Sequence, residues 1–366
     1  MNAPLENFQF REFPPFDRHR AWFPVQTVNP ISFAGWDELL QTHNDYSFFH
    51  TAEWAAVLQK TYGYEPLYFF ISDTTHLRAL LPVMKIKSWL TGRRGISLPF
   101  TDSCVPLNQD LELNDEILPE VLIHGTAAHW RYFECRGGKN FFDGAPASES
   151  YYGHELKLQR DVHLLFDRCK STTRGAVNKA LRDGVTVDFS HSEEAMEQFY
   201  LLHCRTRRRH GLPPQPPEFF RNIQNYIFDR NMGFVTLATF QKSVIAAAVF
   251  FHFGHRAIFK YGASDRSQLH LRGNNLILWE TIKWLSENGF ESLDFGRTSF
   301  ADEGLRKFKL GWGTVEKQID YVRYDFSRRE FVTVNDAPHK WRRRFFRALP
   351  LALSKSIGTM LYQHAA

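Results

Sequence analysis

The clearest pattern of hydrophobic and polar positions lies in residues 256–313. Residues 257–263 mix β-branched, aromatic and small side chains, which is typical of a central strand. Residues 264–272 are polar and rich in turn formers, so they predict a connection at the end of that strand. Because polar groups gather at the turns of this unit, we expect its chemistry to lie there.

A helix, a second strand and a second helix are predicted after this connection. Apolar residues recur at helical spacing over residues 276–285, after a candidate N-cap at Asn274 or Asn275. An Asn-Gly pair then provides a C-terminal stop signal. Residues 291–295 predict a short buried strand, and residues 302–308 predict a final short helix.

The same order of elements is expected twice along the chain. In the first half the pattern predicts two helices, a hairpin, a strand, a helix and a strand, over residues 36–43, 51–62, 67–72 with 77–87, 96–100, 115–129 and 131–136. In the second half the unit described above follows two helices and a hairpin, over residues 192–210, 217–230 and 233–239 with 243–253. These copies predict a structural repeat that has lost most of its sequence similarity.

Length and composition agree with a globular protein of two domains. The chain has 366 residues, of which 43% are hydrophobic and 23% charged, so each half is long enough to bury a core. The formal net charge of +5 is a mild excess of 45 basic over 40 acidic residues. It suits an anionic substrate without requiring nucleic acid, and no sequence-specific DNA binding is expected.

The cysteines and the apolar segments predict a reduced, cytoplasmic protein. The 4 cysteines are widely spaced without a C-x-x-C pair, which indicates neither a metal site nor a disulfide framework. The N-terminus lacks a basic segment followed by an apolar one, which argues against a secretion signal. The longest apolar run, residues 244–253, has about half of the ~20 residues that a membrane span needs.

Five strings of residues in the second half carry a resemblance to a known family. They are TRRRHGLPPQP, FKYGASD, GNNLILWE, DFGRTS and GLRKFKLGWG, which begin at Thr206, Phe259, Gly273, Asp294 and Gly304. In this order they resemble the C-terminal half of the FemABX-like aminoacyl and acyl transferases, a branch of the GNAT N-acyltransferase superfamily. The first half matches more loosely, through FFHTAEW, which ends at Trp54, and SLPFTD, which ends at Asp102.

The resemblance implies a fold, a division into domains and an activity. The fold is α/β (α+β), with tandem GNAT-like (acyl-CoA N-acyltransferase) domains and mixed central sheets. The domains are expected at residues 24–155 and 156–335, followed by a basic amphipathic tail at residues 336–366. The activity is transfer of an aminoacyl or acyl group to an amine of a cell-envelope precursor, of peptidoglycan or exopolysaccharide type. A non-catalytic saccharide or phospho-ligand binding protein with the same fold is the alternative.

The requirements of N-acyl transfer direct attention to three candidate catalytic residues. The reaction needs a deprotonated amine and donors for a developing oxyanion, and GNAT proteins generally use direct attack without a covalent intermediate. Lys309 matches the family's FK motif, in which the lysine stabilises charge at the transfer centre, although a surface lysine is the alternative. Tyr261 matches a substrate-contacting tyrosine and could instead belong to the core. Asp102 is the candidate general base of the first half, unless it only forms a turn.

Several other residues are expected to bind substrate. Arg297 follows a strand, where its guanidinium could clamp a carboxylate or phosphate or pair with Asp294. Thr206 and Arg209 lie three residues apart on one helical face, as a phosphate-facing pair would. If Arg297 and Tyr261 meet Lys309 at one cleft, the catalytic interpretation is favoured over the binding protein.

The remaining substrate-binding candidates are Lys260 and Trp54. Lys260 neighbours Tyr261 on a strand, so we expect only one of the two to face a given side of the sheet. Trp54 belongs to the N-terminal motif, after which peptidoglycan-bridge members carry a lysine. Here Leu58 stands four residues after Trp54 and the lysine is Lys60, so interpeptide bridge formation is not inherited directly.

The donor is expected at Arg272, Gly273, Asn274 and Asn275, where a loop meets a helix N-terminus. Backbone N–H groups and the helix dipole favour a pyrophosphate there, while Asn275 could also be only a cap. The single glycine departs from the pattern of coenzyme A users. This departure argues against acetyl-CoA and leaves aminoacyl-tRNA, another acyl carrier or acyl-CoA bound in an atypical way open as donors. No tightly bound cofactor is expected. The acceptor is an amine-bearing sugar, a lipid-linked saccharide or a peptide.

Two basic segments remain. Residues 170–182 predict a basic helix, which is either a solvated face or a phosphate contact. In the tail, apolar residues recur every fourth position from Trp341 to Leu361 among arginines, and Pro350 divides it into two short helices. Such a segment either lies on an anionic membrane surface, as a peripheral attachment, or packs onto its own domain.

Overall fold

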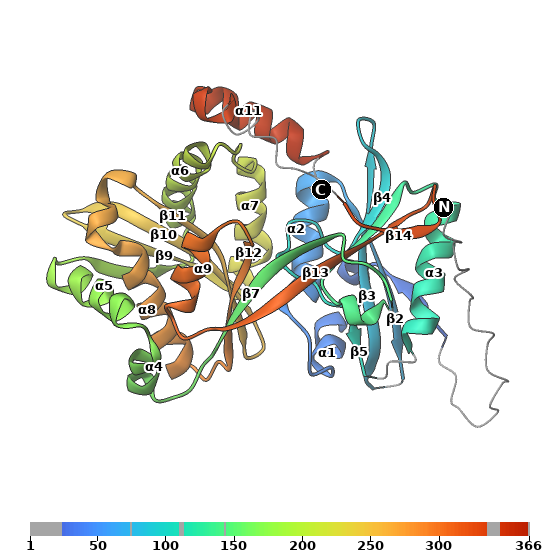
Figure 1. Cartoon of the computed structure of the whole chain (residues 1–366), viewed down its shortest axis with the longest axis horizontal. Coiled ribbons are helices and arrows are strands. Elements are labelled where there is room, and N and C mark those ends of the chain that lie inside the picture. The colour runs from blue at the N-terminus through green and yellow to red at the C-terminus, as the bar shows by residue number, and fades with distance from the viewer. Residues whose placement is uncertain (1–23, 74, 110–112, 143, 335–344, 365–366) are drawn as a thin grey trace, which may run out of the picture.

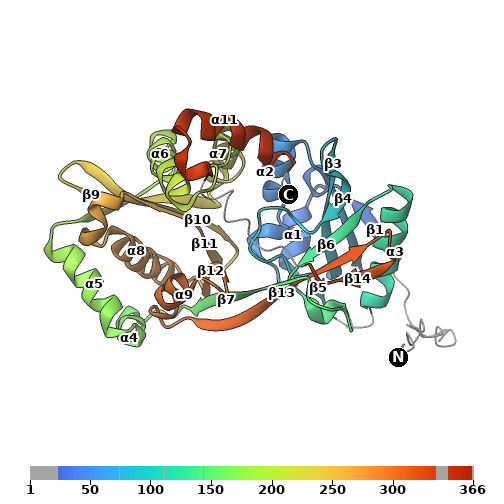
Figure 2. The same ribbon diagram turned by 45° about the horizontal axis from the view of Figure 1, so that its top comes forward.

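The structure is a computed structural model that describes residues 24–364 apart from residues 74, 110–112, 143 and 335–344 (Figure 1). Two α/β halves lie side by side and share one sheet that runs through the whole molecule (Figures 1 and 2). The described part of the tail lies across the top of both halves in these views.

The first half follows the predicted order of elements. It consists of β1 (Gln26–Val28), α1 (Trp36–Gln41), α2 (Ala52–Tyr62), β2 (Glu65–Ser72), β3 (Leu77–Ser88), β4 (Gly92–Ile96), β5 (Leu107–Asn108), α3 (Asn114–Ala127), β6 (Tyr132–Arg136) and β7 (Glu149–Lys157). The predicted helices and the hairpin are confirmed. The strand predicted over residues 96–100 is wrong, because β4 ends at Ile96 and the chain then turns with Leu98 and Phe100 at positive φ.

The second half repeats this order and adds further elements. It consists of α4 (Val162–Arg168), α5 (Ser171–Arg182), β8 (Thr186–Ser190), α6 (Glu193–His210), α7 (Pro217–Tyr226), β9 (Gly233–Phe240), β10 (Ser243–Phe253), β11 (Arg256–Ser264), α8 (Gly273–Glu287), β12 (Ser292–Ser299), α9 (Glu303–Leu310), β13 (Val315–Asp325), β14 (Glu330–Val332) and, in the tail, α11 (Leu351–Tyr362). The α/β class with a mixed sheet is confirmed.

The halves exchange their last strands. Along the sheet the order is β1-β2-β3-β4-β6-β13-β7-β12-β11-β10-β9-β8, with β5 on β3 and β14 on β13. β7, from the first half, pairs with β12 of the second half, and β13, from the second half, pairs with β6 of the first. The two exchanged strands also pair with each other between Val315 and Tyr321. The expected domain boundary after residue 155 therefore lies inside β7, and the division into two domains stays a prediction.

Core packing also joins the halves. One hydrophobic cluster contains Phe48 and Trp54 of the first half together with Phe219 and Phe251 of the second. The rings of Phe48 and Phe251 stack with centroids 4.7 Å apart, and Trp54 meets Phe219 edge-on at 6.0 Å. Aromatic pairs of this kind add stabilisation beyond their buried area. The two halves therefore share one hydrophobic core.

The tail helix α11 packs onto the protein's own surface. Tyr362 accepts a hydrogen bond from Arg207 of α6, and its backbone carbonyl accepts one from the Tyr64 hydroxyl at 2.9 Å. Near the end of the described chain, the His364 carbonyl accepts a hydrogen bond from Arg94 at 2.9 Å. The tail residues from 335 to 344, with most of the basic charge predicted there, lie outside the described residues.

Candidate active site

The site lies where two neighbouring parallel strands separate. β11 and β12 pair only over Arg256–Ile258 and Ser292–Asp294, and they pair no further toward their C-terminal ends. α8 and α9 lie near these strands (Figure 2). Beyond Ile258 and Asp294 the two strands are not paired with each other, so the residues that follow can interact with other parts of the chain.

A β-bulge brings Lys260 and Tyr261 to the same side of the sheet. The register between β10 and β11 shifts at this point, so that Tyr261 opposes Val249 and Phe259 opposes Phe250, leaving Lys260 as the extra residue. The Lys260 Nζ lies 5.4 Å from the Tyr261 ring centroid. The expectation that only one of the pair faces the cleft is wrong, because strict alternation fails at a bulge.

Lys260 forms a buried ion pair with Asp102 of the first half. The Lys260 Nζ lies 2.9 Å from Asp102 Oδ2 and 2.7 Å from the Phe100 carbonyl oxygen, and its side chain is only 4% exposed. Burial raises the pKa of Asp102, but Lys260, together with the charge of Arg297, outweighs it and leaves that pKa below its ordinary value. Asp102 is therefore ionised at neutral pH.

Gly296 allows Asp102 to approach β12. Its φ of +69° lies in the left-handed region, and a Cβ there would stand 3.1 Å from the Asp102 carboxyl carbon. The Gly296 N–H donates to Asp294 Oδ1 at 2.6 Å, which holds the turn. The DFG string of the sequence thus creates a place for a carboxylate that comes from the other half.

Arg297 reaches the exchanged strands rather than Asp294. It donates to the Tyr321 hydroxyl at 2.8 Å and lies over the Tyr151 ring, 4.3 Å from its centroid. The Tyr321 hydroxyl in turn donates to the Asp102 carbonyl oxygen at 2.8 Å. Tyr151 and Tyr321 were missed by sequence reasoning, since no local pattern marks β7 or β13 as neighbours of β12.

Lys309 is buried against the Gly296–Arg297 backbone of β12. This residue of α9 is only 3% exposed. Its Nζ donates to the carbonyl oxygens of Gly296 at 2.8 Å and Arg297 at 3.0 Å. Burial lowers the pKa of Lys309 to about 8, although nearby carboxylates such as Asp102 favour the charged form. An ammonium group has three N–H donors, so one remains beyond those two carbonyls. The surface-lysine alternative is wrong.

We call Asp102, Lys260, Arg297 and Lys309 the charged cluster. Both halves contribute to it, and each of its members was predicted from the sequence. Its chemistry suits a site where negative charge develops, because three cations surround one carboxylate in a buried environment. Tyr261 borders the charged cluster and packs on Phe199, Phe219, Phe220 and His203.

Trp54 lies deeper than a substrate contact would. It is fully buried among Phe48, Phe49 and Phe219, and Lys260 Nζ lies 5.9 Å from its ring centroid. In this position the indole supports Lys260 through a cation–π contact. A role in substrate binding stays a prediction for Trp54.

The predicted donor loop lines a cavity of about 190 Å³, which also reaches Phe308, the neighbour of Lys309 in α9. The other lining residues are Ile245 and Ala246 of β10, Ser264 at the end of β11, Asp265, Gln268, Leu269 and Arg272 to Asn275. α8 begins at Gly273, where a Cβ would stand 3.2 Å from the Ala246 side chain, so glycine permits the close approach of helix and sheet. The N-cap of α8 is Arg272, at φ 60°. The prediction that Asn274 or Asn275 caps this helix is therefore wrong.

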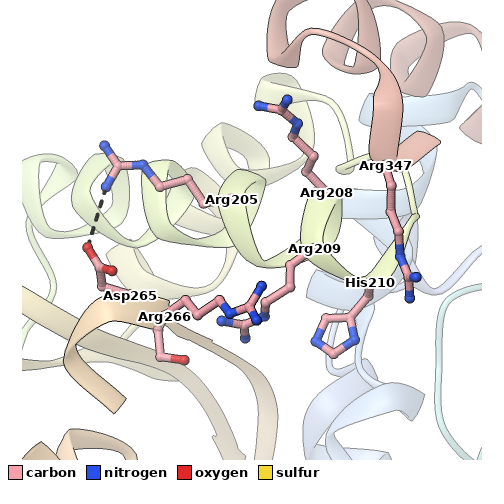
Figure 3. A pocket seen from close by; sticks show the side chains of 8 residues that line it. Arg205, Arg208, Arg209, His210, Asp265, Arg266 and Arg347 are labelled. Atoms are coloured by element: carbon pink, nitrogen blue, oxygen red, sulfur yellow. Dashed lines mark ion pairs between the residues drawn. The ribbon is translucent and has the colours of Figure 1, made fainter. Parts of the chain in front are cut away.

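Thr206 and Arg209 occupy different environments. The Thr206 hydroxyl accepts from the Ser264 N–H at 3.2 Å and lies 3.4 Å from the Ser264 carbonyl oxygen, so it fastens α6 to the end of β11. Arg209 lines a larger pocket next to the donor cavity (Figure 3). The two pockets share Ser264 and Asp265.

A thiol mechanism and a metal site find no support in the described residues. His203 hydrogen-bonds Gln215 at 2.8 Å, burial lowers its pKa to about 3, and burial raises the pKa of the adjacent Cys204. A neutral imidazole beside an un-ionised thiol is not an activated pair. Within the part of the chain that the structure describes, no group of three metal-ligating side chains occurs, and no helix is long and apolar enough to cross a membrane.

Comparisons with known proteins bear on the family and the fold of the chain. Residues 167–316 match the family described as acetyltransferase (GNAT) domain. Over 151 residues the chain is 22% identical to UDP-N-acetylmuramoylpentapeptide-lysine N(6)-alanyltransferase of Weissella viridescens, which covers 41% of this chain and 44% of that protein. The chain thus matches less than half the length of this curated relative.

Solved structures show the same fold over most of the chain. The crystal structure of FemX has a TM-score of 0.63 at 15% identity, covering 78% of this chain and 94% of that one. A tandem GNAT protein from the clavulanic acid biosynthesis pathway has a TM-score of 0.51 at 9% identity, covering 82% and 98%. Residues 167–316 therefore form a GNAT-type acetyltransferase domain, and the fold over most of the chain is the one seen in FemX and in the tandem GNAT protein. In sequence the chain is similar to a Fem-type alanyltransferase over part of its length.

Proposed function

We propose that this protein transfers an aminoacyl or acyl group to an amine of a cell-envelope or polysaccharide precursor. The observation that carries the proposal is the charged cluster, in which side chains of both halves meet where β11 and β12 separate. A buried arrangement of cations beside a helix N-terminus suits stabilisation of an oxyanion and of a phosphate-bearing leaving group.

The reaction requires one bond to form and one to break. The acceptor nitrogen attacks the donor's carbonyl carbon, a C–N bond forms, the carbon–oxygen or carbon–sulfur bond to the carrier breaks, and the amine proton leaves to the carrier or to solvent. We assign the remaining N–H of Lys309 to the developing oxyanion, since its other two donors already bond to backbone carbonyls. Asp102, which is ionised, attracts and orients the acceptor's ammonium form before it loses its proton.

The acyl carrier belongs in the cavity beside Arg272 and Gly273. There the first backbone N–H groups of α8, a helix of 15 residues, point out of the helix end without intrahelical partners. The curated relative's name specifies alanyl transfer to the lysine of a UDP-N-acetylmuramoyl pentapeptide, which favours a peptidoglycan precursor as the acceptor. We pair this acceptor with aminoacyl-tRNA, the aminoacyl donor that the single glycine of the loop leaves open. Acyl-CoA and an amino sugar are the second pair.

The test is a transfer assay with both pairs. Purified protein is incubated with alanyl-tRNA or acetyl-CoA and with a nucleotide-linked muropeptide or an amino sugar, and mass spectrometry follows the acceptor. We expect one pair to give an acceptor heavier by one acyl group. Retention of a saccharide or phospho-ligand without any transfer would instead favour a binding protein.

The donor site is tested by removing the Arg272 charge. Arg272→Ala should weaken donor binding and flatten its dependence on salt, because one exposed cation near the phosphates is lost. Isothermal calorimetry with acyl-CoA and with aminoacyl-tRNA measures both. Unchanged affinity for each donor would place the carrier elsewhere.

We also propose that the tail attaches the enzyme to anionic membranes. On α11 the side chains of Leu353 and Met360 are 53% and 69% exposed, and Trp89, which is 84% exposed, lies against His364 at the end of the described chain. Apolar groups at such a surface enter the membrane interface, and basic residues add attraction. Co-sedimentation with anionic vesicles should therefore fall when Trp89 and Met360 are both changed to serine. Equal pelleting of variant and parent would contradict this.

A further inference from the structure

A second pocket of about 840 Å³ lies next to the donor cavity and is lined almost entirely by basic side chains (Figure 3). The lining residues are Arg205, Arg208, Arg209 and His210 of α6, Ser264, Asp265 and Arg266 after β11, and Arg347 of the tail. Three segments that are distant in sequence therefore contribute positive charge to one hollow.

Most of these guanidinium groups have no internal partner. Arg205 lies 4.0 Å from Asp265, the only carboxylate that lines the pocket. For Arg209, Arg266 and Arg347 no ion pair or hydrogen bond occurs among the described residues. Uncompensated cations that share a pocket repel one another, so the arrangement is unfavourable unless an anion occupies it.

His210 is an exposed residue that lines the pocket, close to Arg347 (Figure 3). Partial burial, followed by the charges of Arg209 and Arg207, lowers the pKa of His210, and Arg347 adds to the effect. Figure 3 shows Arg347 extending from the tail toward His210, so this arginine forms part of the pocket lining. The tail is thus part of the wall and is not merely covering the outside.

We propose that this pocket, completed by Arg347 of the tail, binds several phosphate groups of a nucleotide-bearing ligand. Guanidinium groups recognise phosphate through charge-assisted, often bidentate hydrogen bonds, and several of them surround one volume here. The proposal rests on the proposed function in one respect: the pocket shares Ser264 and Asp265 with the donor cavity, which assigns the phosphates to the nucleotide part of the acyl carrier.

Two carriers contain this chemistry, and binding experiments distinguish them. A fluorescein-labelled single-stranded RNA and coenzyme A are titrated separately against the full chain, with no acceptor and no turnover. For the RNA, the slope of log affinity against log salt reports about 0.7 per neutralised phosphate. A steep slope without competition by coenzyme A indicates RNA phosphates, whereas tight binding of coenzyme A that displaces the RNA indicates its adenosine phosphates.

The decisive variants are Arg266→Ala and Arg347→Ala. Each should weaken binding of the preferred probe roughly tenfold at low salt, as loss of one charge-assisted contact to phosphate implies, and each should reduce the salt slope by about one contact. Arg328→Ala is the matched control, because Arg328 is exposed at the β13–β14 turn, where the preceding end of β13 pairs with β6 of the first half and not with elements that line the pocket. It should leave affinity and slope unchanged.

The proposal fails if neither probe binds, if Arg347→Ala binds like the parent, or if Arg328→Ala weakens binding equally. The same experiments distinguish failure of this proposal from failure of the proposed transferase activity. Lys309→Met should retain probe binding while losing transfer, because Lys309 does not line the pocket. If the parent protein binds the probe but shows no transfer, only the proposed activity is overturned. Transfer that survives in Arg347→Ala with unchanged probe affinity would overturn only the pocket.

Discussion

At the scale of single residues, the site depends on how burial changes the protonation and the interactions of charged side chains. Lys309 is almost fully buried, yet two backbone carbonyls and the neighbouring carboxylates keep its ammonium form available. A desolvated cation interacts more strongly with developing negative charge than an exposed one does. The same residue in the sequence looks like any lysine between two apolar neighbours.

Replacing Lys309 by methionine should lower turnover by roughly 10²-fold or more, as expected for loss of a preorganised donor to an oxyanion. Lys307→Met is the control, since Lys307 lies exposed on the same helix. Steady-state kinetics and a thermal melt of both variants give the result. A Lys309→Met enzyme with near-normal turnover would remove Lys309 from the catalytic residues.

The lowered pKa of Lys309 predicts how the rate depends on pH. Burial holds this pKa at about 8, below the ordinary value for lysine, so the cation is present below about pH 8 and is lost as the pH rises. Asp102 stays ionised throughout this range because its pKa is lowered. The transfer rate should therefore fall above about pH 8, and Lys309→Arg, which does not titrate there, should remove the fall. A flat profile in the parent up to pH 10 would contradict this.

At the scale of elements, irregularities of strands create the site. The bulge at Lys260 and the left-handed turn at Gly296 direct side chains of β11 and β12 toward Asp102. Neither feature follows from the hydrophobic pattern, which predicted both strands as regular. Bulges and positive φ angles are local departures that tertiary contacts stabilise, and they often occur beside functional sites.

Gly296→Ala tests the turn against a matched glycine. Gly289 also has a positive φ, of +78°, but nothing lies within 4 Å of a Cβ built there. Each alanine variant should lose about 1–2 kcal/mol of the free energy of unfolding for the left-handed backbone. Only Gly296→Ala should also push Asp102 away and reduce transfer by roughly tenfold. Denaturant melts and kinetics separate the two effects. Equal activity in both variants would show that the approach of Asp102 is unimportant.

At the scale of the whole molecule, the two halves are structurally inseparable. Each half completes its sheet with a strand from the other, and the largest core cluster contains aromatic residues from both. Asp102 of the first half consequently pairs with Lys260 of the second across this junction. The charged cluster exists only when both halves are folded.

We expect a single cooperative unfolding transition. Removing one half would leave β6 without β13, or β12 without β7, and would expose the shared core. Calorimetry of the full chain should give equal calorimetric and van't Hoff enthalpies, and a fragment of residues 24–155 should not fold alone. Two resolved transitions, or a stable fragment, would show that the halves are independent domains.

The tail should contribute to stability as well as to binding. Deleting residues 351–366 removes the hydrogen bonds from Tyr64 and Arg94 to the tail's carbonyls, each with a net contribution of about 1 kcal/mol. The free energy of unfolding should fall by roughly 2 kcal/mol or more. Met360→Ser, on the exposed side of α11, should leave it unchanged. A deletion variant as stable as the parent would mean that these contacts are not maintained in solution.

The sequence by itself determined most helices, both hairpins and the members of the charged cluster. These are local properties, because helix periodicity, caps and turn residues act over a few positions. Lys309, Arg297 and Asp102 could be named because their strings resemble a known family. The role of the tail and the division into two domains were predicted in the same way and stay predictions.

Only the tertiary structure decided which strands meet and which charges share a site. The exchange of β7 and β13 depends on pairing between residues more than a hundred positions apart, for which a local pattern carries no signal. That exchange places Tyr321 between Arg297 and Asp102. The basic pocket arises in the same way, since Arg209, Arg266 and Arg347 are ordinary surface arginines until the fold brings them to one wall.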